Sequence, residues 1–325
     1  PQRRTVLQRV ALVLLGLALI ASAGAQRTLT VAQTVDIPGF DPHNHGLTAV
    51  EAVITNVFDY LLFRDANGDI QPALATAYEQ VDDLTWRFTL RDDVVWHDGE
   101  PFTAEDVKFS LERVARDESL FEHDSFQQIA EVEIVNDHEV LIHTSGPDPV
   151  LLNRVSRKGA DIVPAHVIEA VGWESFSVNP VGTGPFRFVE WVRDDRVVLE
   201  AFPDHWRGAP AWDRLVFRAV PEDATRVGEL LTGNVDIAVN FPSQDVARVR
   251  ATDGADVISQ PTTRIMMLLF NTADGKATAD PRVREAIELA IDKELLVEVV
   301  ADGFGVPVEA RVSPGVGSAS VNVSV

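Results

Sequence analysis

Strand-like and helix-like patterns of apolar residues alternate along most of this chain, from residue 28 to residue 231. The clearest strand pattern is at residues 85–91, where Trp86, Phe88 and Leu90 share one face because successive side chains of a strand point to opposite sides. Stretches with the 3.6-residue period of a helix lie between strands of this kind. Strands and helices that are interleaved rather than segregated predict an α/β or α+β architecture.

The most complete helix signal begins at Thr103, which suits an N-cap, with Asp106 three residues later in a capping-box pattern. Val107, Leu111 and Val114 follow on one face and predict the buried side of this helix. Further helices are predicted at residues 49–62 and 222–231, the second of them closed by a glycine at 233. Further strands are predicted at residues 28–36, 94–96, 131–135, 139–143, 186–191, 196–201, 215–219 and 235–239.

The pattern changes beyond residue 260. An unbroken apolar run at residues 265–270 predicts a fully buried strand. Asp280 and Pro281 then open a helix, because Asp suits the N-cap and Pro suits the first helical position. Asp292 caps a second helix that ends at Gly303. Residues 313–325 show no periodicity and predict no regular structure.

Residues 1–25 have the three parts of an export signal peptide. A positively charged start precedes an apolar run at residues 10–20, and small residues at 23–25 suit a signal peptidase, which predicts cleavage before Gln26. The apolar run is shorter than the about 20 residues of a membrane-spanning helix, although an uncleaved anchor stays an alternative. The adjacent Arg3 and Arg4 leave general secretion and twin-arginine export both open. The mature protein is predicted to be exported and soluble, in the periplasm or outside the cell.

The composition excludes several classes of protein. The 325-residue chain has no cysteine, so a disulfide framework, a thiolate metal site, a cysteine nucleophile and a lipid-modified cysteine are all excluded. Its formal net charge of -22 at pH 7 repels nucleic acid and anionic lipid. A chain of this length buries a sizeable core and usually divides into more than one lobe.

No enzyme signature is present, since the sequence has no GxSxG elbow, HExxH helix, Walker loop or GxGxxG turn. His97 and Asp98 are the only nominees for acid–base catalysis, but they adjoin a glycine in a turn, where Asp is expected for its own backbone hydrogen bonds. His43 and His45 lie two residues apart in a loop and are candidates to hold a metal, although two solvated histidines are the simpler interpretation. We predict no catalytic residue, no metal site and no cofactor.

The sequence GTGPF at residues 182–186 places two glycines just before a predicted strand. Glycine lets a backbone adopt unusual dihedral angles and approach a neighbour closely. The motif therefore predicts either a hinge or pocket wall, or only a tight turn that leads into the strand.

Four blocks of the sequence, taken in order, carry a resemblance to known proteins. They are LATAYEQVDDLTWRFTLRDDVVWHDGEPFTAEDVKFSLERV at residues 74–114, NPVGTGPFRFVEW at 179–191, ELLTGNVDIA at 229–238 and FNTADGKATADPRVREAIELAIDKELLVEVVADGFGVP at 270–307. These blocks resemble the family 5 extracellular solute-binding proteins of ABC transporters. The resemblance covers residues 28–307, and four ordered blocks are more specific than any single motif. Two positions depart mildly from the family pattern: His205 precedes Trp206 where an aromatic residue is usual, and Tyr78 stands where tryptophan is common.

The resemblance implies a class II, periplasmic-binding-protein-like α/β fold with two lobes that close on a solute. Lobe I is expected at residues 26–260, and residues 261–325 are expected to begin lobe II. Because family members are considerably longer, the resemblance also implies a C-terminally truncated chain with an incomplete second lobe.

The function implied by the resemblance is that of the extracytoplasmic substrate-binding component of an ABC importer. Such a component captures peptides or related small solutes without catalysis, works as a monomer, and presents its cargo to an ABC permease in the membrane. One alternative is a nickel-chelate-binding or haem-binding member of the same fold, which is suggested by His43 and His45 in the loop. A hydrolase that uses His97 and Asp98 is the other.

The resemblance also implies where a ligand is contacted in the parts of the fold that this sequence covers. The first three candidates match the loop after the first strand, the next two form a second wall, and the last stands at the head of lobe II, where it faces the cleft or caps its own strand. The six candidates are Gly46, Leu47, Thr48, Phe121, His123 and Asn271. The charged residues that clamp peptide termini in family members have no counterpart here, so the cargo stays open.

Overall fold

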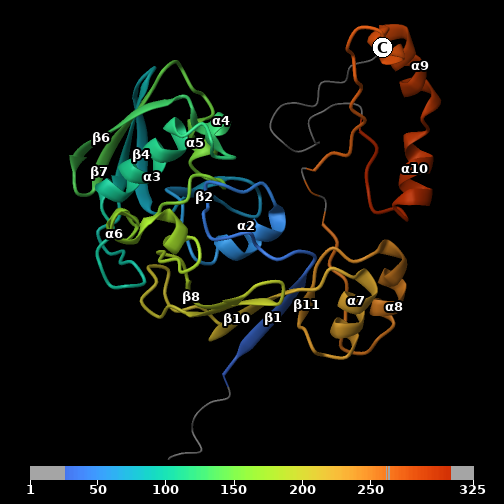
Figure 1. Cartoon of the computed structure of the whole chain (residues 1–325), viewed down its shortest axis with the longest axis horizontal. Helices are drawn as coiled ribbons and strands as arrows, with labels where there is room; N and C mark the ends of the chain where they lie inside the picture. Colours follow the sequence, from blue (N-terminus) through green and yellow to red (C-terminus); the bar gives the residue numbers. More distant parts are fainter. Residues whose placement is uncertain (1–25, 261, 263, 309–325) are drawn as a thin grey trace, which may run out of the picture. The chain divides into compact units, whose positions relative to one another are not determined.

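The computed structural model describes residues 26–260, 262 and 264–308, which form a mixed α/β protein (Figure 1). The predicted signal peptide at residues 1–25 and the irregular tail at 313–325 lie outside the described residues. The chain divides into two compact units, with the boundary between Asn240 and Phe241. The lobe boundary expected at residue 260 concerns the lobes of the family fold and stays a prediction.

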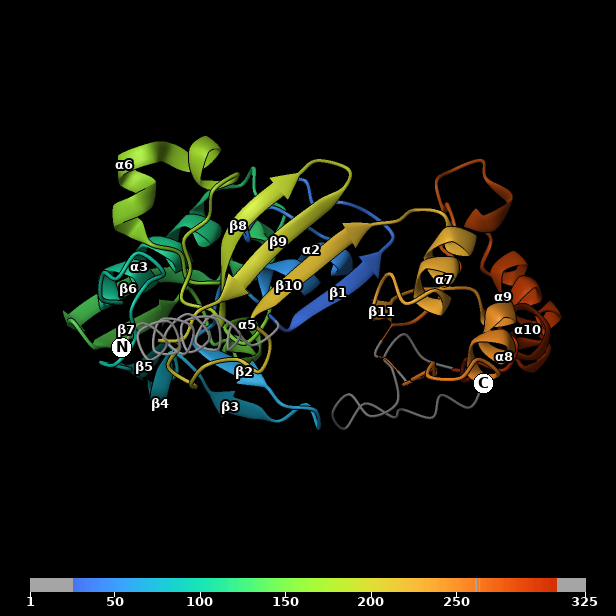
Figure 2. The same cartoon turned by 90° about the horizontal axis from the view of Figure 1, so that it is seen from below.

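A five-stranded sheet forms one layer of the first unit (Figure 2). Its order is β11-β1-β10-β9-β8, in which β1 runs parallel to both of its neighbours and the remaining pairs are antiparallel. The strands are β1 (Thr28–Gln33), β8 (Phe186–Val192), β9 (Arg196–Ala201), β10 (Arg214–Ala219) and β11 (Ile237–Ala238). All five were predicted, although β1 and β11 are shorter than their apolar patterns.

A four-stranded antiparallel sheet with the order β4-β5-β7-β6 forms a second layer. A short hairpin, β2-β3, stands apart from it. The strands are β2 (Leu62–Arg64), β3 (Ile70–Pro72), β4 (Ala75–Asp82), β5 (Thr85–Leu90), β6 (Ile129–Asn136) and β7 (Glu139–Thr144). The strand predicted at residues 94–96 is wrong, because only a single bridge forms there, between Val95 and Pro101.

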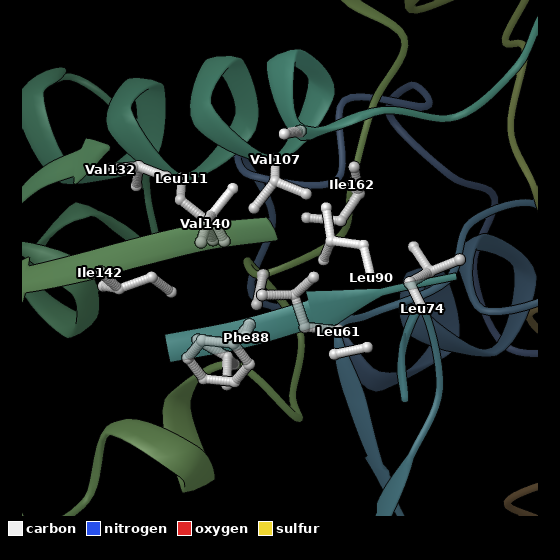
Figure 3. Packing of buried hydrophobic residues seen from close by; sticks show 14 of the residues in the cluster. Leu61, Leu74, Phe88, Leu90, Val107, Leu111, Val132, Val140, Ile142 and Ile162 are labelled. Carbon is white, nitrogen blue, oxygen red and sulfur yellow. The ribbon is translucent and has the colours of Figure 1, made fainter. Parts of the chain in front are cut away.

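Helix α3 (Ala104–Arg116) covers one face of the four-stranded sheet. The predicted capping box is confirmed, with the Asp106 carboxylate accepting the Thr103 backbone N–H at 3.0 Å. Figure 3 shows Val107 and Leu111 pointing from the helix toward Val140, among the fully buried side chains of this core. The period-two strand and the 3.6-period helix therefore bury each other's apolar faces.

Helix α2 (Thr48–Ile54) packs on the five-stranded sheet, and Figures 1 and 2 both show it against one face. The prediction that this helix continues to residue 62 is wrong. The carbonyls of Asn56 and Val57 instead accept hydrogen bonds from the backbone N–H groups of Phe186 and Gly184, at 2.9 Å each. Because these carbonyls are taken by another part of the chain, the helix ends before them.

Four further helices lie in the described part of the first unit. They are α4 (His123–Phe126), α5 (Leu151–Arg154), α6 (Ala165–Phe176) and α7 (Asp223–Leu231). The predicted end of α7 is confirmed, since Gly233 has the positive φ of 72° that glycine adopts at such a cap. Arg226 of α7 is fully buried and donates to the backbone carbonyls of Val220 and Val239, which satisfies its charged group.

The described part of the second unit contains short helices and no strand. They are η1 (Ser243–Asp245), α8 (Val246–Arg250), η2 (Ala277–Ala279), α9 (Pro281–Ala290) and α10 (Lys293–Val300). The predicted caps of α9 and α10 are confirmed, because Asp280 and Asp292 each accept a backbone N–H of the first helical turn. In the part described, an open hollow follows the apolar face of α9.

The prediction of a buried strand at residues 265–270 is wrong. This run is irregular, and Met266 and Leu269 are 87% and 85% exposed. A strand needs a partner for its backbone N–H and carbonyl groups. Within the described residues no strand pairs with this run, so its hydrophobicity by itself does not produce β-structure.

Candidate functional site

The structure places three of the six predicted ligand residues where α2 begins. Leu47 occupies the N-cap position, and its carbonyl accepts hydrogen bonds from the backbone N–H groups of Val50 and Glu51 at 3.1 Å each. Gly46 and Thr48 flank it, and all three residues are exposed. The first turn of α2 therefore sets the position of this exposed stretch of backbone.

Phe121 lies directly against this stretch. A Cβ on Gly46 would stand 2.7 Å from Cε1 of the Phe121 ring, so the side chain of any residue other than glycine would collide with it. The backbone N–H of Phe121 donates to Asn44 Oδ1 at 3.2 Å, and the Lys158 ammonium lies 5.2 Å from the ring centroid. The ring is nevertheless 63% exposed. We call Gly46, Leu47, Thr48 and Phe121 the loop surface.

Each of the other two candidates has a local contact of its own. His123 is the first residue of α4, and its ring nitrogen Nδ1 lies 3.3 Å from the carbonyl of Val114 in the last turns of α3. Asn271 belongs to the second unit, where its Oδ1 accepts the backbone N–H of Ala273 at 3.1 Å. The interpretation that Asn271 caps its own strand is wrong, because no strand precedes it; it closes a local turn instead.

His43 is a structural residue and not a solvated one. Its ring is fully buried, with Nδ1 2.9 Å from Arg113 Nη1 and Nε2 2.9 Å from the carbonyl of Asp161. Because arginine only donates, Nδ1 must accept and Nε2 must carry the proton. Burial, followed by the neighbouring Arg113 charge, lowers the pKa of His43 to about 4. The simpler interpretation of this histidine was therefore wrong, and both of its ring nitrogens are occupied.

His45 is also buried, but its environment is different. Within the described residues, neither ring nitrogen has a hydrogen-bond partner, and Nε2 lies 3.5 Å from Glu51 Oε2, which has none either. Burial, followed by the nearby Lys158 ammonium, lowers the pKa of His45. In the described ranges, no group of three or more His, Asp or Glu side chains has a geometry that holds a metal ion. The alternative in which the two histidines form a metal site has no geometric support.

A dense set of charged groups surrounds His45 below the loop surface. We call it the polar cluster; its members are His45, Glu51, Tyr60, Glu122, Arg157, Lys158 and Asp161. Glu122 accepts hydrogen bonds from both Lys158 and Arg157, the second at 3.0 Å. Lys158 also lies 3.5 Å from the carbonyl of His45. The cluster thus joins the loop after β1 to two distant segments of the chain.

Two carboxyl groups of the polar cluster are held in an environment that disfavours their charge. Burial raises the pKa of Glu51, even though Tyr60 donates a hydrogen bond to it. Burial, followed by the neighbouring Glu51, raises the pKa of Asp161 well above its ordinary value. One oxygen of each carboxyl group has no hydrogen-bond partner in the described structure. In the described structure the cluster therefore leaves two carboxyl oxygens without a donor.

A second charged contact fixes the same loop from the other side. Asp41 receives two hydrogen bonds from Arg113, at 2.8 and 2.7 Å. The Arg113 guanidinium also lies 3.2 Å from the ring centroid of Trp173 in α6. Burial by itself would raise the pKa of Asp41, but the Arg113 contact outweighs it and the pKa is lowered. The segment that leads to the loop surface is thus held by an ionised pair.

His97 and Asp98, the candidate catalytic pair, do not contact each other through their side chains in the described structure. His97 Nδ1 accepts the backbone N–H of Gly182 at 3.1 Å, and Nε2 lies 2.9 Å from the carbonyl of Gly184. Burial lowers the pKa of His97 to about 4. Asp98 contacts His166 instead, at 2.9 Å. The histidine therefore holds the GTGPF motif in place and is not directed at a reacting group.

The two glycines of GTGPF permit a close approach between two backbones. A Cβ on Gly182 or Gly184 would lie 2.7 or 2.6 Å from the carbonyl carbon of Val57. Thr183 between them donates to the carboxylate of Asp59 at 3.0 Å. Of the two interpretations of this motif, the described contacts support the tight entry to β8.

A match to the model of the bacterial extracellular solute-binding proteins, family 5 Middle, runs from residue 69 to residue 324. The chain belongs to this family. The resemblance seen in the four sequence blocks is thereby confirmed. Among curated relatives of this family 5 protein, the glutathione-binding protein GsiB of Salmonella typhi is 28% identical over 295 residues, which cover 90% of this chain and 57% of GsiB.

Solved structures show the same fold. NikZ from Campylobacter jejuni, in complex with Ni(L-His), has 28% identity and a TM-score of 0.75, over 86% of this chain and 56% of its own. The oligopeptide-binding protein AppA from Bacillus subtilis, in complex with a nonapeptide, has 23% identity and a TM-score of 0.80, over 89% and 59%. The predicted class II, periplasmic-binding-protein-like α/β fold is confirmed. The family 5 chain spans a little over half the length of these proteins.

GsiB and AppA are named as binding proteins. Among the described residues, no helix of this family 5 protein is long and apolar enough to cross a membrane.

The sequence analysis missed the polar cluster. Lys158 and Asp161 lie in the stretch RKGADIVP, where an aspartate stands directly before an apolar run, and this was the available signal. A charged residue beside a buried strand-like run is often paired, but its partners Glu51 and Glu122 are far away in sequence. Only the fold brings them together.

Proposed function

We propose that this protein is the extracytoplasmic substrate-binding component of an ABC importer and captures peptides or related small solutes by closure of two lobes. The main support for this proposal is the family match at residues 69–324, together with the fold shared with AppA at a TM-score of 0.80. GsiB binds glutathione, and the AppA structure contains a nonapeptide, so a peptide-like cargo is the common theme. An ABC permease in the membrane is the partner, and the working form is an exported, soluble monomer.

The loop surface is the part of lobe I that we assign to the solute. Its residues are exposed and its position is set by α2, while the Phe121 ring lies against Gly46 with the Lys158 ammonium 5.2 Å from its centroid. An aromatic ring that already packs on its neighbours loses less conformational freedom when a ligand packs on it. His123 and Asn271 stay in the proposal as candidates at the edge of the site.

Calorimetric titration tests the function. The purified protein is titrated with glutathione, a set of short peptides and a nickel–histidine chelate, and we expect saturable binding of a peptide-like solute without turnover. Binding of the chelate alone would favour a metal-chelate cargo over peptides. The absence of binding to every solute tested would contradict the proposal.

A matched pair of variants tests the site. We expect Phe121→Ala to weaken solute binding by roughly tenfold, because a packed aromatic contact contributes about 1.5 kcal/mol. Trp212→Ala, which removes a 40% exposed aromatic ring elsewhere in the first unit, should leave the affinity unchanged. Equal affinity of Phe121→Ala and the unaltered protein would remove Phe121 from the site.

A further inference from the structure

The contact between His45 and Glu51 lies directly beneath the loop surface. His45 precedes Gly46 in the chain, and Glu51 lies in the first turn of α2, with its backbone N–H bonded to the carbonyl of Leu47. The two side chains approach to 3.5 Å, between His45 Nε2 and Glu51 Oε2, without forming a hydrogen bond. A change in this contact therefore acts at once on the loop and on the helix that positions it.

The hydrogen-bond donors around this contact are bonded to other acceptors. Glu122 takes up the charges of Lys158 and Arg157, and Tyr60 donates to the other oxygen of Glu51. Asp161 adds a second carboxyl group, with one oxygen that has no partner. On the loop side, Asp41 is already paired with Arg113, which also occupies Nδ1 of His43. Buried polar atoms without partners are costly. With the single N–H of neutral His45 on Nδ1, Nε2 and Glu51 Oε2 are both acceptors, and one added proton is the smallest donor that satisfies the two.

We propose that one proton, shared by His45 Nε2 and Glu51 Oε2, enters this contact as the pH falls and ties the loop surface to α2. Whichever atom carries it, the proton lies between a nitrogen and an oxygen and converts their 3.5 Å contact into a hydrogen bond. The pair changes from a net charge of -1 to zero, which a buried site favours. His45 is thus a positioning residue: it acts on the loop surface and not on the solute itself.

The neighbouring charges decide how far this uptake is favoured. Glu122 and Asp41 attract a proton to His45, whereas Lys158 opposes it. Because the ammonium of Lys158 is paired with Glu122, its opposition to proton uptake is reduced. An effect of this proton uptake on solute capture rests on the proposed function. The proton site between His45 and Glu51 does not.

The first test follows the protonation of each histidine ring by NMR across the range from pH 4 to pH 8. We expect His45 to titrate below the usual range of a histidine, and Glu51→Gln to lower its midpoint further because the carboxylate partner is lost. His166→Gln, which removes an exposed ring bonded to Asp98, is the control and should leave the His45 midpoint unchanged. A His45 midpoint that is the same with and without Glu51 would overturn the shared proton.

The second test measures hydrogen exchange of the Val50 and Glu51 amides, which donate to the Leu47 carbonyl. After correction for the intrinsic pH dependence, we expect exchange to be roughly tenfold slower at pH 5 than at pH 7.5, as one added hydrogen bond to a charged group predicts. His45→Gln should abolish the difference, and Glu51→Gln should reduce it. Equal protection of these amides from exchange at both pH values in the unaltered protein would refute the proposed proton uptake. Neither measurement requires a solute.

Discussion

Strand β5 and the run at residues 265–270 are both six residues long and both were predicted as strands, yet only β5 forms one. Strand β5 pairs with β4 and β7 and buries Phe88 completely under α3. The later run has more consecutive apolar residues but pairs with no strand of the described chain, and Leu269 is 85% exposed. Hydrophobicity sets what a segment can bury, whereas strand formation depends on the partners that the rest of the fold supplies.

The largest expected contrast between the two regions is in their contribution to stability. Phe88→Ala should lower the free energy of unfolding of the first unit by about 3–5 kcal/mol, because it leaves a cavity in a closed core. Leu269→Ala should change the free energy of unfolding by less than about 0.5 kcal/mol, since the side chain is exposed. Urea denaturation followed by tryptophan fluorescence measures both. A large loss in the second variant would mean that residues 265–270 are buried in solution.

The pH dependence of stability should also separate the two units, because all eight histidines lie between residues 43 and 205. The pKa of His43 is lowered from 6.5 to about 4 in the folded protein, so folding favours its neutral form. Its contribution is therefore complete above about pH 6.5 and is lost as the pH falls toward 4, by up to about 3 kcal/mol.

His43→Gln tests this assignment. Glutamine accepts and donates much as the neutral ring does, but it does not titrate. Thermal unfolding at pH 7.5 and pH 4.5 should show a smaller acid loss in the variant than in the unaltered protein. Part of the loss should persist, because the pKa of His97 is lowered to about 4 as well. An identical acid loss in both proteins would assign the effect to groups other than His43.

The smallest contrast concerns the helix caps. Thr103→Ala removes one half of the capping box of α3 and should lower the free energy of unfolding of the first unit by about 1 kcal/mol. Asp280→Ala removes the cap of α9, a helix with no buried residue, and should reduce only the helical circular dichroism signal. A shift of the main unfolding transition in the second variant would show that α9 belongs to the same cooperative unit as α3.

Much of the fold followed from local patterns. The capping box at Thr103, the strands at residues 196–201 and 214–219, and the caps of α9 and α10 were all predictable, because each depends on residues that are neighbours in the sequence. The predictions that failed depended on distant partners. Helix α2 ends early because Gly184 and Phe186 take its next carbonyls, and residues 265–270 find no strand to pair with.

The candidate site was predicted only in part. Gly46, Leu47 and Thr48 were chosen from the resemblance, and the contact of Phe121 with Gly46 joins two of the predicted positions. Their role in solute binding stays a proposal. The interpretation of His43 failed because its two partners, Arg113 and the carbonyl of Asp161, are 70 and 118 residues away.

The sequence by itself determined the family, the mixed α/β class and those strands and helix caps that depend on local periodicity, since ordered motifs and short-range patterns are written along the chain. The tertiary structure alone decided which polar groups are buried and which of those find partners. His43 and His45 are two residues apart and chemically identical, yet among the described residues both ring nitrogens of the first have a hydrogen-bond partner and those of the second have none. The physical reason is that burial and pairing depend on contacts between residues far apart in the sequence, and no local pattern encodes those contacts.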